Sequence, residues 1–183
     1  METTISTRAA ASERLQAAVA TLRGLDLPDS SSGLVRAGLD IAEIVRSLDA
    51  DDDVVIAAMV QPLLDAKLLD PAAADRQFGA DATRLALTLR QLGEFGLSTD
   101  WRPEQGLEPG QAEALRKMLL AVIGDVRLVV VRLAGQLQKM RAAKSLEPLL
   151  QRKLATETRE VYAPLANRLG VWQLKWELED LAF

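Results

Sequence analysis

Apolar residues recur at the three- and four-residue spacing of an α-helix along most of the chain, and this pattern restricts the possible folds most strongly. In residues 4–23, for example, Leu15, Val19 and Leu22 form one stripe before Gly24. Strand-like alternation of apolar and polar residues is nearly absent, and aromatic residues make up only 4% of the chain. We therefore expect an all-α helical bundle.

The same periodicity and the positions of Gly and Pro predict where the helices begin and end. We expect a loop over residues 93–110, and helices at 4–23, 34–48, 52–66, 70–78, 80–93, 111–143, 149–168 and 172–183. Asp51, Asp52 and Asp53 open the third helix and could be imagined as a Mg²⁺ site. Capping of free backbone N–H groups is the stronger interpretation. Asp70 is expected to cap the next helix in the same way, with Pro71 as its first residue.

The chain has no histidine and no cysteine, which excludes several kinds of chemistry. A disulfide framework, a thiolate zinc site, a cysteine nucleophile and a serine–histidine triad all need one of these residues. The eleven glycines do not show the spacing of a phosphate-binding loop. Any catalysis would have to use carboxylates, lysines or hydroxyls.

Charge and hydropathy patterning indicate a cytoplasmic protein without a membrane partner. The N-terminus lacks a basic stretch followed by an apolar run, and no window approaches the length of a membrane span. Residues 1–100 hold 9 Lys and Arg against 16 Asp and Glu, whereas residues 101–183 hold 13 against 10. A net charge of +3 in the second part is too weak to predict direct nucleic-acid binding.

The segment at 157–183 carries the most specific pattern in the sequence. It reads Tyr-Ala-Pro-Leu-Ala-Asn-Arg-Leu-Gly at 162–170 and Trp-Glu-Leu-Glu-Asp at 176–180. This closely resembles the junction between the hydrolase-like and synthetase domains of the RelA/SpoT family of alarmone enzymes. Weaker similarity at 40–62 and 132–141 extends the resemblance to about residues 30–183.

The resemblance implies a division into an HD-type hydrolase domain over residues 1–160 and a helical junction over 161–183. In hydrolase-competent members this all-helical domain binds Mn²⁺ through a His…His-Asp…Asp ligand set. Here the first histidine falls at Ala37, within about one residue, and the last aspartate falls at Gly135. The His-Asp pair becomes Gln61-Pro62, and the Glu-Asp pair that follows becomes Asp65-Ala66.

These replacements imply that the domain is a pseudo-hydrolase. Ala, Pro and Gly have no side-chain donor for a metal, and Gln61 offers one neutral oxygen. Without the ion, no metal-activated water is available to attack the 3′ pyrophosphate. We expect no metal, no cofactor and no catalytic residue in this chain.

Pro62 gives an independent reason to expect a changed site. Inside a helix it removes an N–H donor toward the carbonyl of Ala58 and crowds that carbonyl, so the helix should kink or end there. The site is then either reshaped or filled by the apolar residues around Pro62. We favour filling, by Met59, Val60, Leu63 and Leu64, because an empty apolar cavity destabilises a protein.

Three polar residues are candidates for residual nucleotide contacts: Lys139, Arg141 and Asn167. Each has a simpler interpretation. Lys139 and Arg141 fit a solvated helix face, and Asn167 with Arg168 fits a helix C-terminus beside Gly170, which is the interpretation we favour.

For a whole protein, the resemblance implies a RelA-type GTP diphosphokinase of the stringent response, which transfers pyrophosphate from ATP to the 3′ hydroxyl of GTP or GDP. Its Mg²⁺-dependent synthetase would follow Phe183, since the chain ends inside an apolar helix. Ribosomes and uncharged tRNA would bind through C-terminal domains absent here. The present segment would contact the synthetase and bias its conformation. A helical interaction scaffold and an allosteric nucleotide sensor remain alternatives.

Overall fold

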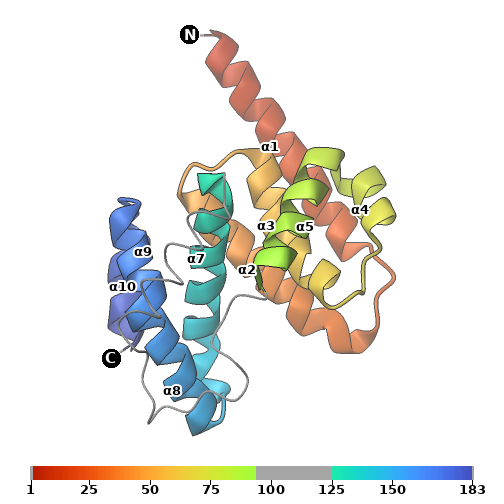
Figure 1. Ribbon diagram of the computed structural model, residues 1–183. Coiled ribbons are helices and arrows are strands. Elements are labelled where there is room, and N and C mark those ends of the chain that lie inside the picture. The colour runs from red at the N-terminus through yellow and green to blue at the C-terminus, as the bar shows by residue number, and fades with distance from the viewer. Residues whose placement is uncertain (1, 94–124, 183) are drawn as a thin grey trace. The chain divides into compact units, whose positions relative to one another are not determined.

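The computed structural model describes residues 2–93 and 125–182, and all secondary structure within these ranges is helical (Figure 1). The all-α prediction is therefore confirmed. The chain divides into two compact units, residues 1–91 and 92–183, and each is described by itself. The domain boundary near residue 160 stays a prediction.

The helices of the first unit are α1 (Glu2–Arg23), α2 (Ser32–Ser47), α3 (Asp52–Asp65), α4 (Pro71–Phe78) and α5 (Ala80–Gly93), with the 3₁₀ turn η1 (Asp29–Ser31) before α2. The second unit contains α7 (Val126–Ala142), η3 (Ala143–Ser145), α8 (Pro148–Glu157), the π-helix η4 (Thr158–Tyr162), α9 (Ala163–Arg168) and α10 (Trp172–Ala182).

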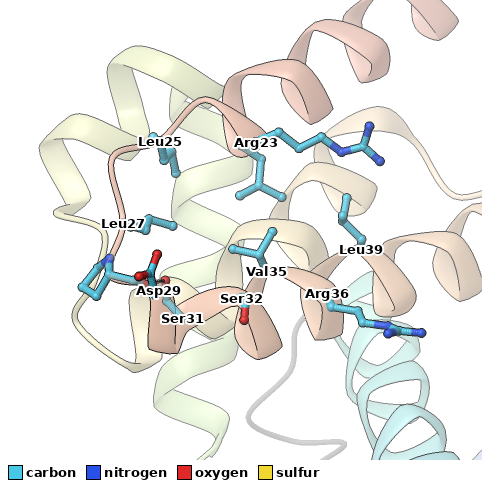
Figure 2. Close-up of a pocket in the computed structure, with 11 residues that line it drawn as sticks. Arg23, Leu25, Leu27, Asp29, Ser31, Ser32, Val35, Arg36 and Leu39 are labelled. Carbon is cyan, nitrogen blue, oxygen red and sulfur yellow. Dashed lines mark hydrogen bonds between the residues drawn. The ribbon is translucent and has the colours of Figure 1, made fainter.

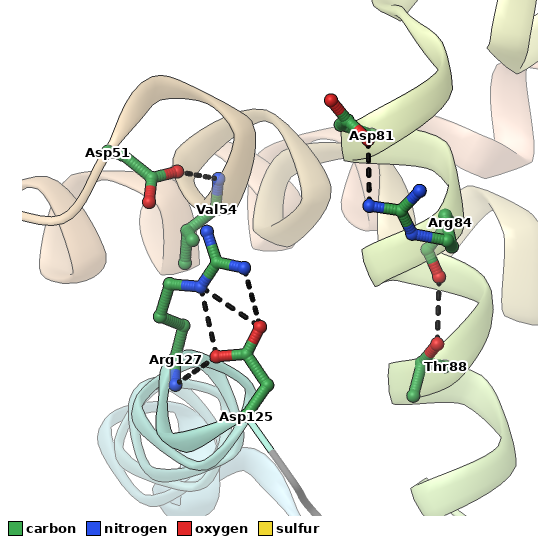
Figure 3. A network of polar contacts seen from close by, with 7 residues as sticks. All are labelled: Asp51, Val54, Asp81, Arg84, Thr88, Asp125 and Arg127. Carbon is green, nitrogen blue, oxygen red and sulfur yellow. Dashed lines mark hydrogen bonds and ion pairs between the residues drawn. The ribbon is translucent and has the colours of Figure 1, made fainter.

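Aspartate caps begin two helices of the first unit, as predicted. The carboxylate of Asp51 accepts a hydrogen bond from the backbone N–H of Val54 at 3.1 Å (Figure 3). Asp70 accepts one from the N–H of Ala73 at 3.0 Å, and Pro71 occupies the first turn of α4. Both caps satisfy N–H groups that have no partner within the helix.

The core of the first unit lies where α2 and α3 cross. Seven consecutive residues of α3, numbers 54–60, are buried. At Gly38 of α2, an added Cβ would overlap the carbonyl oxygen of Met59 and lie 3.1 Å from its carbonyl carbon. Only glycine therefore allows the two helix backbones to approach this closely.

The core of the second unit is formed by α7, α9 and α10. Leu133 and Leu137 of α7 and Leu178 of α10 are at most 1% exposed. Gly170 ends α9 with a positive φ of 71°. Its N–H donates to the carbonyl of Asn167 at 3.1 Å, as expected for a helix C-terminus.

Two predicted helices differ from the structure. The one expected over 111–143 does not run through Asp125, which is extended (φ −128°, ψ 107°) and caps α7, because aspartate favours helix starts over interiors. Residues 111–124 and the predicted loop at 93–110 lie mostly outside the described residues. The helix predicted over 149–168 contains η4, where the Thr158 hydroxyl donates to the Leu154 carbonyl at 2.7 Å and competes for the backbone acceptor.

Candidate functional site

The α2–α3 crossing brings together the first-unit positions that match the family's metal ligands. Ala37 precedes Gly38 in α2, and Gln61 and Pro62 follow Met59 by two and three residues in α3. Because Gly38 contacts the Met59 backbone, Ala37 and Gln61 lie within about one helical turn of the same contact. Ala37, Gln61 and Pro62 are half-buried.

The end of α3 holds the remaining first-unit positions. The amide Nε2 of Gln61 donates a hydrogen bond to the Asp65 carboxylate, four residues further along the helix. Asp65 and Ala66 are exposed. The helix does not end at Pro62 but continues to Asp65, so proline is accommodated within its last turn.

Apolar side chains pack tightly around these positions. Met59, Val60, Leu63 and Leu64 are each at most 1% exposed. Within residues 2–93 and 125–182, no group of three or more His, Cys, Asp or Glu side chains could hold a metal ion. The matched first-unit positions supply one amide, that of Gln61, and one exposed carboxylate, that of Asp65, which differ from the imidazole and carboxylate set that the resemblance implies for Mn²⁺.

Gly135, the fourth matched position, lies in α7 of the second unit and is half-buried. The three candidate nucleotide contacts also lie in this unit. Arg141 is engaged with Glu177 of α10, through Nε to Oε1 at 2.6 Å and Nη2 to Oε2 at 2.9 Å. Asn167 is exposed at the end of α9, and Lys139 is exposed on α7.

A polar pocket of about 330 Å³ lies beside Lys139 within the second unit, and we call it the α7–α8 pocket. Its lining residues come from α7, from α8 with the turn before it, and from η4: Arg132, Gln136, Lys139, Leu146, Leu150, Lys153, Leu154, Glu157 and Tyr162. The sequence interpretation did not identify it. A usable signal was present, because Arg132, Gln136 and Lys139 recur at helical spacing within an otherwise apolar segment.

A second pocket, of about 370 Å³, lies between the end of α1 and the start of α2 (Figure 2). Leu25, Leu27 and Val35 line it, and the guanidinium groups of Arg23 and Arg36 extend away from Leu25 and Leu27. Asp29, Ser31 and Ser32 also line this pocket, and the Ser31 hydroxyl donates to the carbonyl of Pro28.

Shifted pKa values occur at helix starts. Hydrogen bonds from Arg127 lower the pKa of Asp125, which caps α7 (Figure 3). Burial raises the pKa of Asp52, in the first turn of α3. The neighbouring Asp53 pairs with Arg14 at 2.5 Å. The charged carboxylate of Asp125 therefore stabilises the start of α7, whereas burial disfavours the charged form of Asp52.

Comparison with known proteins places the chain in a family. The HD domain model matches residues 11–172. The chain is 36% identical over 143 residues to a probable guanosine-3′,5′-bis(diphosphate) 3′-pyrophosphohydrolase of Synechocystis, covering 78% of this chain and 18% of that protein. It is 36% identical over 157 residues to the GTP pyrophosphokinase of Escherichia coli, covering 85% and 21%. It is 34% identical over 143 residues to the guanosine-3′,5′-bis(diphosphate) 3′-pyrophosphohydrolase of Haemophilus influenzae, covering 78% and 20%.

The chain therefore belongs to the HD-domain family of helical proteins. Within it, the chain is of the RelA/SpoT type, as its sequence predicted. It spans about a fifth of the length of the curated relatives it matches, some named as hydrolases and others as pyrophosphokinases. No helix in the described ranges has the length and apolar character needed to cross a membrane.

Proposed function

We propose that this chain is a catalytically inactive, hydrolase-like regulatory domain of a RelA-type GTP diphosphokinase. The observation that carries the proposal is the composition of the matched metal positions in an HD-type domain without histidine: Ala37, Gln61, Pro62 and Gly135. The buried apolar residues beside Gln61 and Pro62 support it, because the only side-chain donors at the matched positions are the Gln61 amide and the exposed Asp65 carboxylate, with no imidazole.

For the whole protein we propose cytoplasmic transfer of pyrophosphate from ATP to the 3′ hydroxyl of GTP or GDP during the stringent response. Relatives named as GTP pyrophosphokinases support this activity. The Mg²⁺-dependent reaction would take place in a synthetase domain, and ribosome and uncharged tRNA would bind further domains. The present domain would then act by shifting the synthetase between conformations.

The exposed face of α10 is the surface we propose for contact with the synthetase domain. Trp172 and Trp176, one turn apart, are 55% and 58% exposed, while Leu174 and Leu178 of the same helix are buried. The ammonium of Lys175 lies 3.8 Å from the centre of the Trp176 ring. Paired exposed tryptophans next to a cation are typical of protein interfaces.

Hydrolysis is the direct test of inactivity. Incubation of the protein with Mn²⁺ and guanosine-3′,5′-bis(diphosphate) should release no pyrophosphate, whereas the Haemophilus influenzae hydrolase should do so under the same conditions. Calorimetry with Mn²⁺ should show no saturable binding. Turnover, or Mn²⁺ binding that Asp65→Asn abolishes, would contradict the proposal.

An allosteric nucleotide sensor is the second candidate, and the position of Lys139 beside the α7–α8 pocket favours it over a plain scaffold. Saturable, salt-resistant binding of guanosine-3′,5′-bis(diphosphate) in calorimetry would support the sensor. Binding that salt removes, or none, would support the scaffold.

A further inference from the structure

The α7–α8 pocket is lined by none of the positions matched to metal ligands, although Gly135 directly precedes the lining residue Gln136. Its lining includes none of Ala37, Gln61, Pro62 or Gly135, and all nine of its lining residues belong to the second unit. Its volume of about 330 Å³ is within the range of small-molecule sites. Any ligand it binds must be recognised without the metal chemistry of the family.

Arg132 is the most informative side chain in this pocket. Its Nη2 donates a hydrogen bond to the Tyr162 hydroxyl at 3.2 Å, which fixes the guanidinium. Its Nε is buried and has no hydrogen-bond partner. Because Nε is closed off from solvent, a ligand in the pocket would contact the other atoms of the guanidinium, and an oxyanion is the acceptor that suits this group best.

A buried polar network holds the floor of the pocket in place. Gln136 Nε2 donates to the Thr158 hydroxyl at 2.9 Å, and that hydroxyl donates to the Leu154 carbonyl at 2.7 Å. Thr158 and Tyr162 are the first and last residues of the π-helix η4. Short π-helical segments are rare and frequently occur at functional sites, so η4 is a second observation that points to a ligand here.

The charges around the pocket favour an anion with more than one negative charge. Arg132, Lys139 and Lys153 line it together with a single carboxylate, that of Glu157. Three of these side chains have other interactions in the structure: Lys139, Lys153 and Glu157. The net positive charge of the lining is therefore what attracts the anion. A phosphate dianion matches a net charge of +2 better than a carboxylate does.

Apolar side chains complete the pocket on its exposed side. Leu146 and Leu150 are 39% and 50% exposed and lie in the same lining as the cations. A ligand that is only an inorganic anion would leave them in water. A ligand with an apolar or planar group attached to its anionic group would cover them.

We propose that the α7–α8 pocket binds a phosphate monoester that carries an apolar or planar group. The phosphate accepts hydrogen bonds from Arg132, and the attached group packs on Leu146 and Leu150. The proposal rests on the second candidate function, the nucleotide sensor, because it uses the same pocket, and it requires neither a metal nor a synthetase. If phenyl phosphate does not bind, the hydrolysis test is unaffected. If the protein does hydrolyse guanosine-3′,5′-bis(diphosphate), the test of this pocket is unaffected.

Calorimetric titrations of the 183-residue protein with phenyl phosphate, inorganic phosphate and benzoate test the proposal. Phenyl phosphate should bind about tenfold more tightly than inorganic phosphate, because its phenyl ring covers the two leucines and inorganic phosphate has no such group. Benzoate, a monoanion, should bind more weakly than phenyl phosphate. Failure of phenyl phosphate to saturate, or equal binding of benzoate, would overturn the proposal.

Matched variants separate a built site from general charge attraction. Arg132→Gln should weaken phenyl phosphate binding by about tenfold or more, and Arg132→Lys should not restore it, since lysine lacks the paired N–H groups. Arg152→Gln removes the same charge from an exposed position of α8 outside the pocket, and should change binding less than about twofold. Equal losses in Arg132→Gln and Arg152→Gln would overturn the proposal.

A second variant covers the case in which Arg132→Gln is not folded by circular dichroism. Leu150→Ser, at an exposed position, should remove most of the advantage of phenyl phosphate and leave inorganic phosphate binding unchanged. If the advantage of phenyl phosphate persists in Leu150→Ser, the ligand does not occupy this pocket and the proposal is wrong.

Discussion

The α2–α3 crossing and the α7–α8 pocket differ in the kind of side chain that fills the space between helices. At the crossing, Gly38 lets two backbones meet and the surrounding side chains are apolar. At the pocket, the lining residue Gln136 is buried and donates a hydrogen bond to the buried Thr158. Both regions adjoin positions matched to the metal ligands, Ala37 and Gln61 in one unit and Gly135 in the other.

The difference shows that buried polarity persists next to Gly135, whereas the positions at the α2–α3 crossing lie beside apolar residues. Gln136 is only 2% exposed and directly follows Gly135, yet its amide is satisfied by Thr158. Buried polar groups persist where each has a partner, whereas an isolated donor next to apolar residues would be costly. The crossing is therefore expected to be sensitive to volume, and the pocket to hydrogen bonding.

The largest effect is expected at Gly38. Gly38→Ala should lower the free energy of unfolding by about 3 kcal/mol, because the new methyl group overlaps the Met59 backbone. Urea unfolding followed by circular dichroism measures it, and hydrogen exchange of α2 and α3 peptides locates it. Gly33→Ala, in the same helix with open space around it, should leave stability unchanged or raised. Similar losses in both variants would show that the crossing is not limited by volume.

A smaller effect is expected at Thr158. Thr158→Val keeps the shape of the side chain but leaves Gln136 Nε2 buried without an acceptor, which should cost about 2 kcal/mol. Thr88→Val removes an equivalent hydroxyl bond, to the Arg84 carbonyl at 2.9 Å, from a partly exposed position (Figure 3). That control should cost less than about 0.5 kcal/mol. Equal losses of stability in Thr158→Val and Thr88→Val would show that hydrogen bonding near the pocket is no more important than at a partly exposed helix position.

The cap of α7 should contribute in a pH-dependent way. Asp125→Ala should cost about 1 kcal/mol at neutral pH, through loss of the cap to the Arg127 N–H. Because the folded-state pKa of Asp125 is lowered, the charged carboxylate stabilises the fold above its unfolded pKa. The cost should shrink as the pH falls below about 4. Thermal unfolding of both proteins from pH 3 to 7 measures this difference in stability. A difference that grows in acid would contradict the role of the charged carboxylate. As a control, Asp125→Asn should keep most of the cap.

The smallest effect is expected at the Arg141–Glu177 pair. Both side chains are about half exposed, so Arg141→Gln should cost roughly 0.5 kcal/mol and less in high salt. A double-mutant cycle with Glu177→Gln isolates the pair. A coupling energy well above 1 kcal/mol would mean that Arg141 belongs with the buried polar network and not with the surface.

Local chemistry explains which parts of the fold could be predicted. The caps at Asp51 and Asp70 were recognisable, because aspartate before an apolar periodic segment has few other uses. The break at Asp125 had a signal in the Gly124-Asp125 pair, but the apolar periodicity before and after the pair favoured one long helix. The π-helix η4 is followed by Pro164, but a proline does not by itself predict a π-helix. The pairing of Arg141 with Glu177, 36 residues away, depends on packing that sequence spacing does not reveal.

The close contact at Gly38 was missed for a similar reason. A glycine inside a predicted helix usually signals weakness, and its steric role emerges only once α3 is placed against it. The predicted replacement of the metal ligands, in contrast, depends on residue identity alone, since Ala37, Pro62 and Gly135 lack donors whatever their surroundings, and it stays a prediction.

The π-helix η4 also fixes the angular phase between the residues before and after it. An α-helix turns by roughly 100° per residue, and a π-helical segment accommodates one residue more than the α-helical count. Deleting a single residue within η4 would bring α9 toward the α-helical phase of α8, although Pro164 would still lack the N–H that a regular helix needs there. The later side chains would then rotate relative to α8, and Leu165 and Ala166 would leave the core. Burial of the α9 side chains therefore constrains the number of residues in η4 as much as their identity.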